Sequence, residues 1–226
     1  MSIAEKLNVI AENEQKVYDA GYSQSESDFY DIIQDGGNRT DYRHGFMGWQ
    51  SEFLRPKHKV VATGDKRYMF AYNKQLKIVE KDYFDLSKCD RSWGNSYVFD
   101  GCESLEEVQD IGLQATGYYG TYRGCKNLRI IETHRTGSYG DPYTLTFYGC
   151  ESLEEIRNIE GEISKNGFDI SASNKVTHDT LMRIINALKD YSTSGTTYNI
   201  TFGTDNLAKL SDTEKAIATQ KGWTLA

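Results

Sequence analysis

Residues 99–108 read Phe-Asp-Gly-Cys-Glu-Ser-Leu-Glu-Glu-Val, residues 122–131 read Tyr-Arg-Gly-Cys-Lys-Asn-Leu-Arg-Ile-Ile, and residues 147–156 read Phe-Tyr-Gly-Cys-Glu-Ser-Leu-Glu-Glu-Ile. All three copies follow one pattern: aromatic, x, Gly, Cys, x, Ser or Asn, Leu, x, x, Val or Ile. Residues 70–79 keep the aromatic, the Leu and the Val but lack the Gly-Cys pair. The equivalent leucines are Leu76, Leu105, Leu128 and Leu153. Their spacing of 29, 23 and 25 residues indicates repeated structural units that stack on one another.

Stacking explains which positions of the pattern stay constant. One copy cannot bury its own apolar edge, so equivalent residues are expected to lie on their counterparts in the neighbouring copies. The aromatic, Leu and Val/Ile positions then form core columns. Each complete copy also has one glycine and one cysteine at equivalent positions, Gly101, Gly124 and Gly149, and Cys102, Cys125 and Cys150. We expect the glycines to hold a tight bend and the cysteines to form a buried column, because a zinc site needs closely spaced cysteine pairs.

The phrase F-x-G-C-x-S-L-E-E-V/I resembles the BspA-like class of leucine-rich repeats, which is common in gut bacteria and in their phages, over about residues 68 to 163. Residues 179–191 and 206–225 are similar to the closing segment of phage-encoded members, and residues 1–7 and 37–42 are similar to such proteins too. The resemblance implies a non-enzymatic recognition or virion-associated role. With no export signal, no wall anchor and few repeats, the sequence favours a phage or prophage product over a bacterial surface adhesin.

The predicted fold class is α/β: a short leucine-rich-repeat solenoid with parallel strands, an N-terminal helix and an α/β C-terminal cap. We divide the chain into four parts. Residues 1–35 form a helical oligomerisation or capping segment, and residues 36–67 a linker and solenoid entry. Residues 68–170 hold the leucine-rich repeats, and residues 171–226 form the C-terminal cap.

The N-terminal segment has heptad spacing between residues 3 and about 20. Its apolar positions are Ile3, Leu7, Ile10 and Val17, with Glu14 in the same seam. Such a seam lets several copies of the chain assemble into a homo-oligomeric bundle. The alternative is a helix that covers the open first repeat, which solenoids need because the first repeat otherwise exposes its core.

The C-terminal cap has readable helix and strand signals. Thr177 is expected to cap a helix, residues 198–202 alternate as a half-buried strand, and residues 223–225 form a last strand. Ser211 and Glu214 form a capping box, and Gly222 fits the residue after the helix end. The buried stripe of the first helix is Leu181, Ile184, Ile185 and Leu188.

Composition and charge exclude several classes of partner. The chain has 226 residues, of which 38% are hydrophobic, and a formal net charge of −7 with dispersed acids, so neither nucleic-acid binding nor a basic patch is expected. No stretch approaches the roughly 18 to 20 apolar residues that span a bilayer, and the N-terminus lacks a signal-peptide pattern. We therefore expect no membrane insertion, reduced cysteines, and a location in the cytoplasm of the producing bacterium and then in the virion.

No set of residues indicates catalysis, a cofactor or a metal site. The acidic pairs at 106–107 and 154–155 recur at matched repeat positions, so at least one acid of each pair should point outward in a solvated ladder, although a glycosidase would need two facing acids. His134 could act as the base for Cys125 as a nucleophile. However, His134 occupies the position at which the neighbouring copies have Ile111 and Ile159. A core histidine is therefore expected.

Two segments rich in Tyr, Gly and Ser connect the copies, at residues 117–124 and 137–143. Tyrosine gives a large contact area at a low entropy cost, which is why binding surfaces use it. Our candidates for a contact surface are Tyr118, Tyr119, Tyr139 and Tyr143. The alternative is that some of them pack on neighbouring copies.

These observations predict a non-enzymatic, phage-encoded binding or structural protein that is virion-associated as a fibre, tail or head-decoration component. Its partner is expected to be a protein or a cell-surface glycan. One alternative is an intracellular phage factor that binds and blocks a host protein. Another is a glycan-active enzyme on a repeat fold, for which the candidate residues are Glu107, Glu155 and His134.

Overall fold

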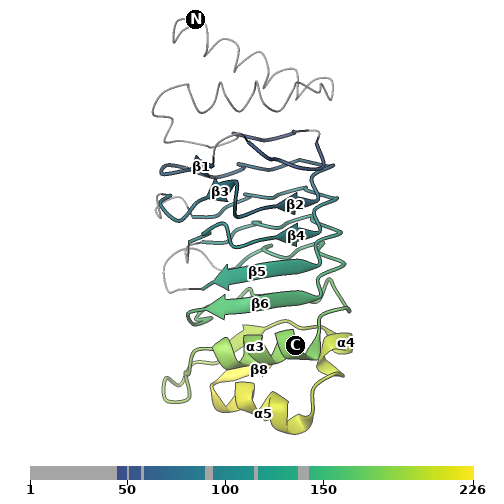
Figure 1. The fold of residues 1–226 in the computed structure, drawn as a ribbon. Helices are drawn as coiled ribbons and strands as arrows, with labels where there is room; N and C mark the ends of the chain where they lie inside the picture. Colours follow the sequence, from purple (N-terminus) through teal and green to yellow (C-terminus); the bar gives the residue numbers. More distant parts are fainter. Residues whose placement is uncertain (1–44, 50, 57–58, 90–93, 115–116, 137–142) are drawn as a thin grey trace, which may run out of the picture.

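The computed structural model describes residues 45–49, 51–56, 59–89, 94–114, 117–136 and 143–226 (Figure 1). The described chain is a mixed α/β structure with parallel strands and few helices. Its layers follow one another along the long axis in chain order, and the helices that the structure describes lie at the C-terminal end.

Three parallel sheets contain the strands of the described residues. Strands β2, β4, β5 and β6 form one sheet in that order, β1 pairs with β3, and β7 pairs with β8. The strand bounds are β1 (Val60–Val61), β2 (Ile78–Val79), β3 (Phe84–Asp85), β4 (Glu107–Val108), β5 (Ile130–Arg135), β6 (Glu155–Glu160), β7 (Tyr198–Ile200) and β8 (Trp223–Leu225). The helices are α3 (His178–Ala187), α4 (Thr204–Leu207) and α5 (Asp212–Gln220).

The register of the four-stranded sheet brings equivalent residues of the copies together. Ile78 pairs with Glu107, Glu107 with Ile130, and Ile130 with Glu155. Each of these residues follows the aromatic of its own copy by the same number of positions. The expectation that equivalent positions lie on their counterparts is confirmed for these copies.

Stacked aromatic rings form one core column. Adjacent rings lie 5.2 to 5.7 Å apart with interplanar angles between 5° and 12°. The rings are Phe46, Phe70, Phe99, Tyr122 and Phe147. All five side chains are at most 2% exposed. The sequence pattern found only four of them.

Among the described residues the first ring of the stack is Phe46, which lies before the boundary at residue 68 that the sequence suggested. Gly48 has a φ of +73°, like the glycines of the complete copies, and Phe53 forms a parallel bridge to Ile78. The backbone N–H of Lys77 donates to the carbonyl of Glu52. This copy is one residue shorter between its aromatic and its strand than the others, which is why its pattern does not align with theirs.

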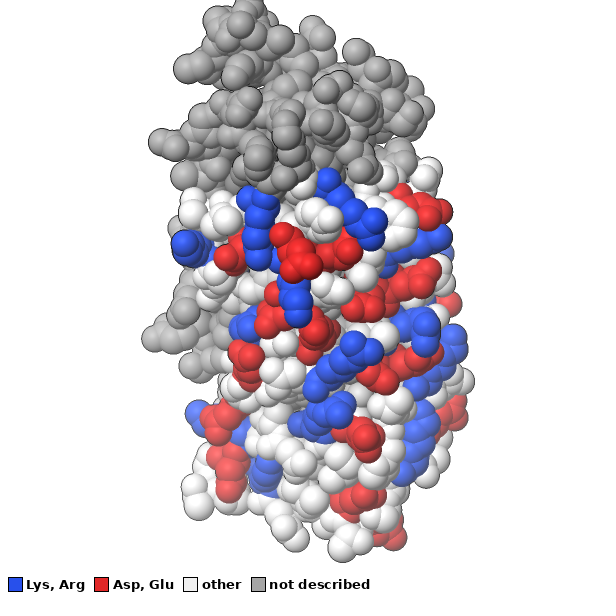
Figure 2. Space-filling model, viewed as in Figure 1, with Lys and Arg blue, Asp and Glu red and all other residues white. Residues whose placement is uncertain are grey.

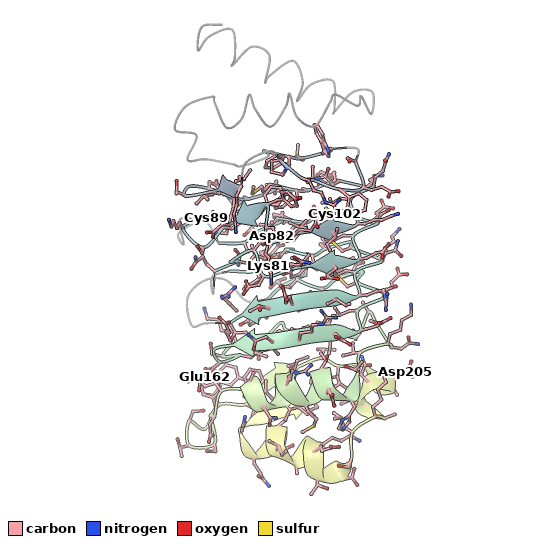
Figure 3. All side chains as sticks on the ribbon, viewed as in Figure 1. Lys81, Asp82, Cys89, Cys102, Glu162 and Asp205 are labelled. Atoms are coloured by element: carbon pink, nitrogen blue, oxygen red, sulfur yellow. The ribbon has the colours of Figure 1, made fainter. Side chains whose placement is uncertain are left out.

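The predicted cysteine column is confirmed. Cys102, Cys125 and Cys150 are at most 1% exposed, and none of them is in a disulfide. Figure 3 places Cys102 among the side chains packed between layers. Each thiol donates a hydrogen bond to the backbone carbonyl of the aromatic in the preceding copy, Phe70, Phe99 and Tyr122 respectively, at 3.0 to 3.1 Å.

Asn73 takes the cysteine position in the copy that lacks Gly-Cys. Its Nδ2 donates to the carbonyls of Phe46 and Phe70, each at 2.7 Å. A small buried donor at this position therefore links each copy to the carbonyl of the one before. Because an unpaired buried carbonyl is costly, this donor stabilises the contact between copies.

The predicted elements of the C-terminal region are confirmed. Thr177 caps α3 by accepting from the N–H of Thr180, and the expected stripe is buried. Ser211 and Glu214 form the capping box of α5, and Gly222 follows the helix end with a φ of +83°. Strand β7 pairs with β8, so the two expected strands pair with each other.

None of the described helices is long and apolar enough to cross a membrane. The predicted N-terminal helix, with its seam at Ile3, Leu7, Ile10 and Val17, lies outside the described residues. Its role in oligomerisation or capping stays a prediction.

Candidate binding surface

One surface of the stack is formed by the segments that lead into the Gly-Cys positions. In the four copies whose core aromatics are Phe70, Phe99, Tyr122 and Phe147, this segment has two residues with positive φ, four positions apart. The pairs are Tyr68 and Tyr72, Tyr97 and Gly101, Gly120 and Gly124, and Leu145 and Gly149. The aromatic of the core column lies between the two members of each pair, so this backbone shape recurs in these four copies.

Four non-glycine residues on this surface adopt the left-handed conformation. Tyr68, Tyr72, Tyr97 and Leu145 have φ values of 58° to 60°, and they are the only non-glycine residues with positive φ in the described part of the chain. A side chain in this conformation costs about 1–2 kcal/mol, and equivalent positions of other copies hold glycine. Such strain concentrates at functional sites, so large side chains retained here point to a functional surface.

A layer of tyrosines covers the outside of these segments. The rings of Tyr68 and Tyr97 stack with centroids 4.8 Å apart, and the Tyr119 ring meets Tyr97 edge-on at 5.3 Å. The Arg123 guanidinium lies 5.0 Å from the Tyr97 ring centroid. We call these side chains, together with Tyr72 and Asp100, the tyrosine layer.

Asp100 fixes the layer from beneath. It is 2% exposed and accepts two hydrogen bonds from Arg123, at 2.7 and 2.5 Å, and one from the Tyr72 hydroxyl at 3.1 Å. The hydrogen bonds to Asp100 raise the pKa of Arg123, and burial followed by the Asp100 charge raises the pKa of Tyr72. Because this two-pronged ion pair is held by a buried carboxylate, the layer is rigid before any partner arrives.

An open groove of about 1020 Å³ borders the tyrosine layer at Arg123. Its lining includes Gly124 and Gly149, and the Tyr148 side chain is 66% exposed there. Arg123 and Tyr148 occupy equivalent positions in consecutive copies, one residue after the core aromatic. Further charged residues of the lining are Asp100, Lys126, Glu151 and Asp169.

The structure corrects two of the four predicted contact tyrosines. Tyr118 and Tyr143 are only 2% and 5% exposed, so they take the packing alternative. They fill the interior beside His134, and burial strongly raises the pKa of Tyr118. Tyr119 is half-buried and belongs to the tyrosine layer, and Tyr139 lies outside the described residues.

Sequence reasoning missed four other tyrosines of this surface, the exposed Tyr72 and Tyr148 and the half-buried Tyr68 and Tyr97. Their signal was their fixed offset from the core aromatic. Tyr68 and Tyr97 precede the core aromatic of their copy by two residues. Tyr72 follows its core aromatic by two residues, and Tyr148 follows its own by one. Because the aromatic points inward, its neighbours on the outer side of the bend point outward.

His134 lies in the core, as predicted. It is fully buried and pairs in register with Ile159, and its ring lies 4.4 Å from the Tyr118 ring. Neither of its ring nitrogens has a hydrogen-bond partner among the described residues. Burial lowers the pKa of His134 to about 3 and raises that of the Cys125 thiol well above its usual range. At neutral pH both groups are therefore uncharged and enclosed.

The acidic pairs lie at the strands, since Glu107 and Glu155 begin β4 and β6 and directly follow Glu106 and Glu154. Figure 2 shows basic and acidic side chains interspersed on one face of the molecule. One column of equivalent positions is Glu52, Lys77, Glu106, Arg129 and Glu154. Lys77 pairs with Glu52 at 3.0 Å, and Arg129 pairs with Glu154 at 2.9 Å. This is the solvated ladder expected from the sequence, and its opposite charges compensate one another.

Among the described residues, no group of three or more His, Cys, Asp or Glu side chains is arranged to hold a metal ion. Comparisons of the chain with models of protein families, with curated proteins and with solved structures found no match.

Proposed function

We propose that the chain is a non-enzymatic binding protein built as a short leucine-rich-repeat solenoid, and that the tyrosine layer and its groove form its recognition surface. The observation that carries the proposal is the set of strained, outward-facing residues on one surface, Tyr68, Tyr72, Tyr97 and Leu145. Glycine takes the equivalent positions of other copies, so the course of the backbone does not require these side chains.

The physical properties of the layer support this function. Tyrosine and arginine dominate the energetics of protein binding sites, because they bury a large area and combine apolar contact with hydrogen bonds. Asp100 holds Arg123 and Tyr72 in place before binding, which lowers the entropy lost on association. The strand surface, by contrast, has charges that already compensate one another.

The biological setting is proposed from the resemblance of the repeats and of the C-terminal segment to BspA-like proteins of phage type. The chain is then a phage product carried on the virion as a fibre, tail or head-decoration component. The N-terminal segment attaches or oligomerises it, and the tyrosine layer faces the partner. The alternative is an intracellular phage factor that uses the same surface to block a host protein.

A binding experiment with matched variants tests the surface. Tyr97→Asn combined with Tyr148→Ser removes two rings of the surface, and asparagine tolerates the left-handed conformation at position 97. Arg129→Gln combined with Glu154→Gln is the control, because it removes an exposed ion pair of the strand surface. We expect the fluorescently labelled protein and the control to bind host cells, or immobilised host-cell extract, in a saturable way. The tyrosine variant should lose this binding while its circular-dichroism melt is retained.

Saturable binding that is equal for the two variants would reject the tyrosine layer as the recognition surface. Mass spectrometry of purified phage particles separates the two biological settings. A fixed number of copies per particle supports the virion role. Absence from particles, with binding only to the cell extract, supports the intracellular alternative.

A further inference from the structure

We propose that the groove beside Tyr148 binds a neutral carbohydrate chain, with the Tyr148 ring as the surface on which a sugar stacks. This inference rests on the proposed function, and it names the class of ligand for one part of the recognition surface. The proposed site is the groove itself. The side chains of the tyrosine layer are already in contact with one another.

The Tyr148 side chain is available to a ligand. It is 66% exposed, and its ring makes no ring contact or side-chain hydrogen bond within the described part of the chain. The other tyrosines of the surface are engaged with Arg123, Asp100 or one another. A large ring exposed to water gains stabilisation when it is buried, and the C–H face of a sugar ring can cover it.

The groove forms where glycines take the place of a larger residue. Position 72 corresponds to Gly101, Gly124 and Gly149 in the later copies, and the Tyr72 ring lies over Gly101 so closely that a Cβ on that glycine would be 2.8 Å from it. At Gly124 and Gly149 the equivalent space is empty of side chains, and both glycines line the groove. An open floor with an aromatic ring beside it suits a flat ligand.

The charged groups of the groove favour a neutral ligand with hydroxyls. Arg123 and Lys126 can donate hydrogen bonds, and Glu151 and Asp169 can accept them. Neither Glu151 nor Asp169 forms an ion pair with another described residue, and one Asp169 oxygen accepts from the N–H and the hydroxyl of Ser171. Each sugar hydroxyl both donates and accepts, so a sugar satisfies both kinds of group.

Charged polymers fit this lining less well. An acidic polysaccharide brings its carboxylates or sulfates close to Glu151 and Asp169, which repel them. A basic peptide brings its positive charges close to Arg123 and Lys126, which repel them. The size of the groove, about 1020 Å³, lies at the upper end of the range of about 300–1,000 Å³ for small-ligand sites, so it accommodates more than one sugar unit.

The test is an array of neutral and anionic bacterial and host glycans, probed with the full-length chain, followed by calorimetry with the best neutral oligosaccharide. We expect neutral glycans to be bound in preference to anionic ones. Tyr148→Ala should weaken binding at least about tenfold, because the stacking ring is lost. Tyr148→Phe keeps the ring and should retain affinity. Arg129→Gln combined with Glu154→Gln, which removes an exposed ion pair of the strand surface, is the matched control and should also retain affinity.

The proposal is overturned if no neutral glycan binds, if anionic glycans bind best, or if Tyr148→Ala binds as tightly as the unaltered chain. This failure is distinguishable from a failure of the proposed function. If the Tyr97 and Tyr148 double variant loses binding to host cells while the array stays blank, the recognition surface stands and its ligand is not a neutral sugar.

Discussion

At the scale of single residues, the clearest conflict with ordinary packing rules is at His134. Buried polar atoms are nearly always hydrogen-bonded, yet neither nitrogen of this imidazole has a partner among the described residues. The surrounding rings are Tyr118, Tyr143, Phe147 and Phe168. An apolar surrounding penalises the imidazolium form most, because nothing compensates its charge.

Stability should therefore fall in acid through His134. Its pKa is about 3 in the folded chain and 6.5 as the ordinary value, so the unfolded chain takes up the proton first. The stability that depends on a neutral His134 is fully present above pH 6.5 and is lost as the pH falls toward 3, by a total of about 5 kcal/mol. We expect His134→Ile, which copies Ile159 of the adjacent strand, to be the more stable protein at pH 4.

Urea unfolding at pH 7.5 and pH 4 measures this difference. The comparison between the two proteins cancels the carboxylates that also titrate in this range. An equal loss of stability for both proteins between the two pH values would show that His134 does not remain neutral in the folded chain.

Single residues also show which positions of the surface could be predicted from the sequence and which could not. The inward aromatic, Leu and Cys positions were predictable, because three copies repeat the same letters in register. The sequence could not show which of Tyr118 and Tyr119 is buried. The paired left-handed residues interrupt any simple alternation of inward and outward side chains along the segment. The result is that neighbours in sequence have opposite environments, the first buried and the second part of the tyrosine layer.

At the scale of elements, the length of the connection between bend and strand decides whether a copy can be recognised in the sequence. The Phe46 copy escaped prediction because it is one residue shorter before its strand, so its letters fall out of register although its ring stacks on Phe70. The C-terminal helices were predictable because their capping residues act locally. Contacts between copies that depend on the close approach of two backbones leave no such local signal.

Gly112, which follows β4, makes such a contact. It has a φ of +77°, and a Cβ there would lie 2.8 Å from the backbone nitrogen of Ser87 in the preceding copy. Gly195 has a similar φ of +68° with nothing within 4 Å of such a Cβ. Gly195→Ala should cost about 1–2 kcal/mol for the conformation alone, and Gly112→Ala should cost more, since the two backbones must also separate.

Thermal and urea unfolding of both variants test this expectation. The two glycines differ in their surroundings and hardly in φ, so the difference between the variants reports the contact between copies. Equal losses of stability would mean that the two neighbouring backbones can separate at no cost.

At the scale of the whole molecule, each copy contacts the copy before it and the copy after it along the chain (Figure 1). Stability in such stacks is approximately a sum of terms for single units and for contacts between neighbours. A defect in a central copy is therefore expected to act mainly on the copies next to it.

Leu128→Ala tests this expectation in a central copy. Leu128 is fully buried, and the truncation should cost about 2–5 kcal/mol. We expect faster hydrogen exchange in β4, β5 and β6, with little change in α5, measured by mass spectrometry of peptides. Uniformly faster exchange along the described chain would instead indicate that all layers unfold as one cooperative unit.

The alternating charges of the strand surface bear on how the chain finds its order during folding. Copies so similar could pair with the wrong neighbour if one were skipped, a known failure of repeat proteins. Skipping the copy that contains Arg129 would bring Glu106 next to Glu154, and skipping the one before it would bring Lys77 next to Arg129. The column Lys74, Glu103, Lys126 and Glu151 alternates in the same way. Like charges thus penalise each omitted layer, and the correct sequence of layers is the one in which opposite signs meet.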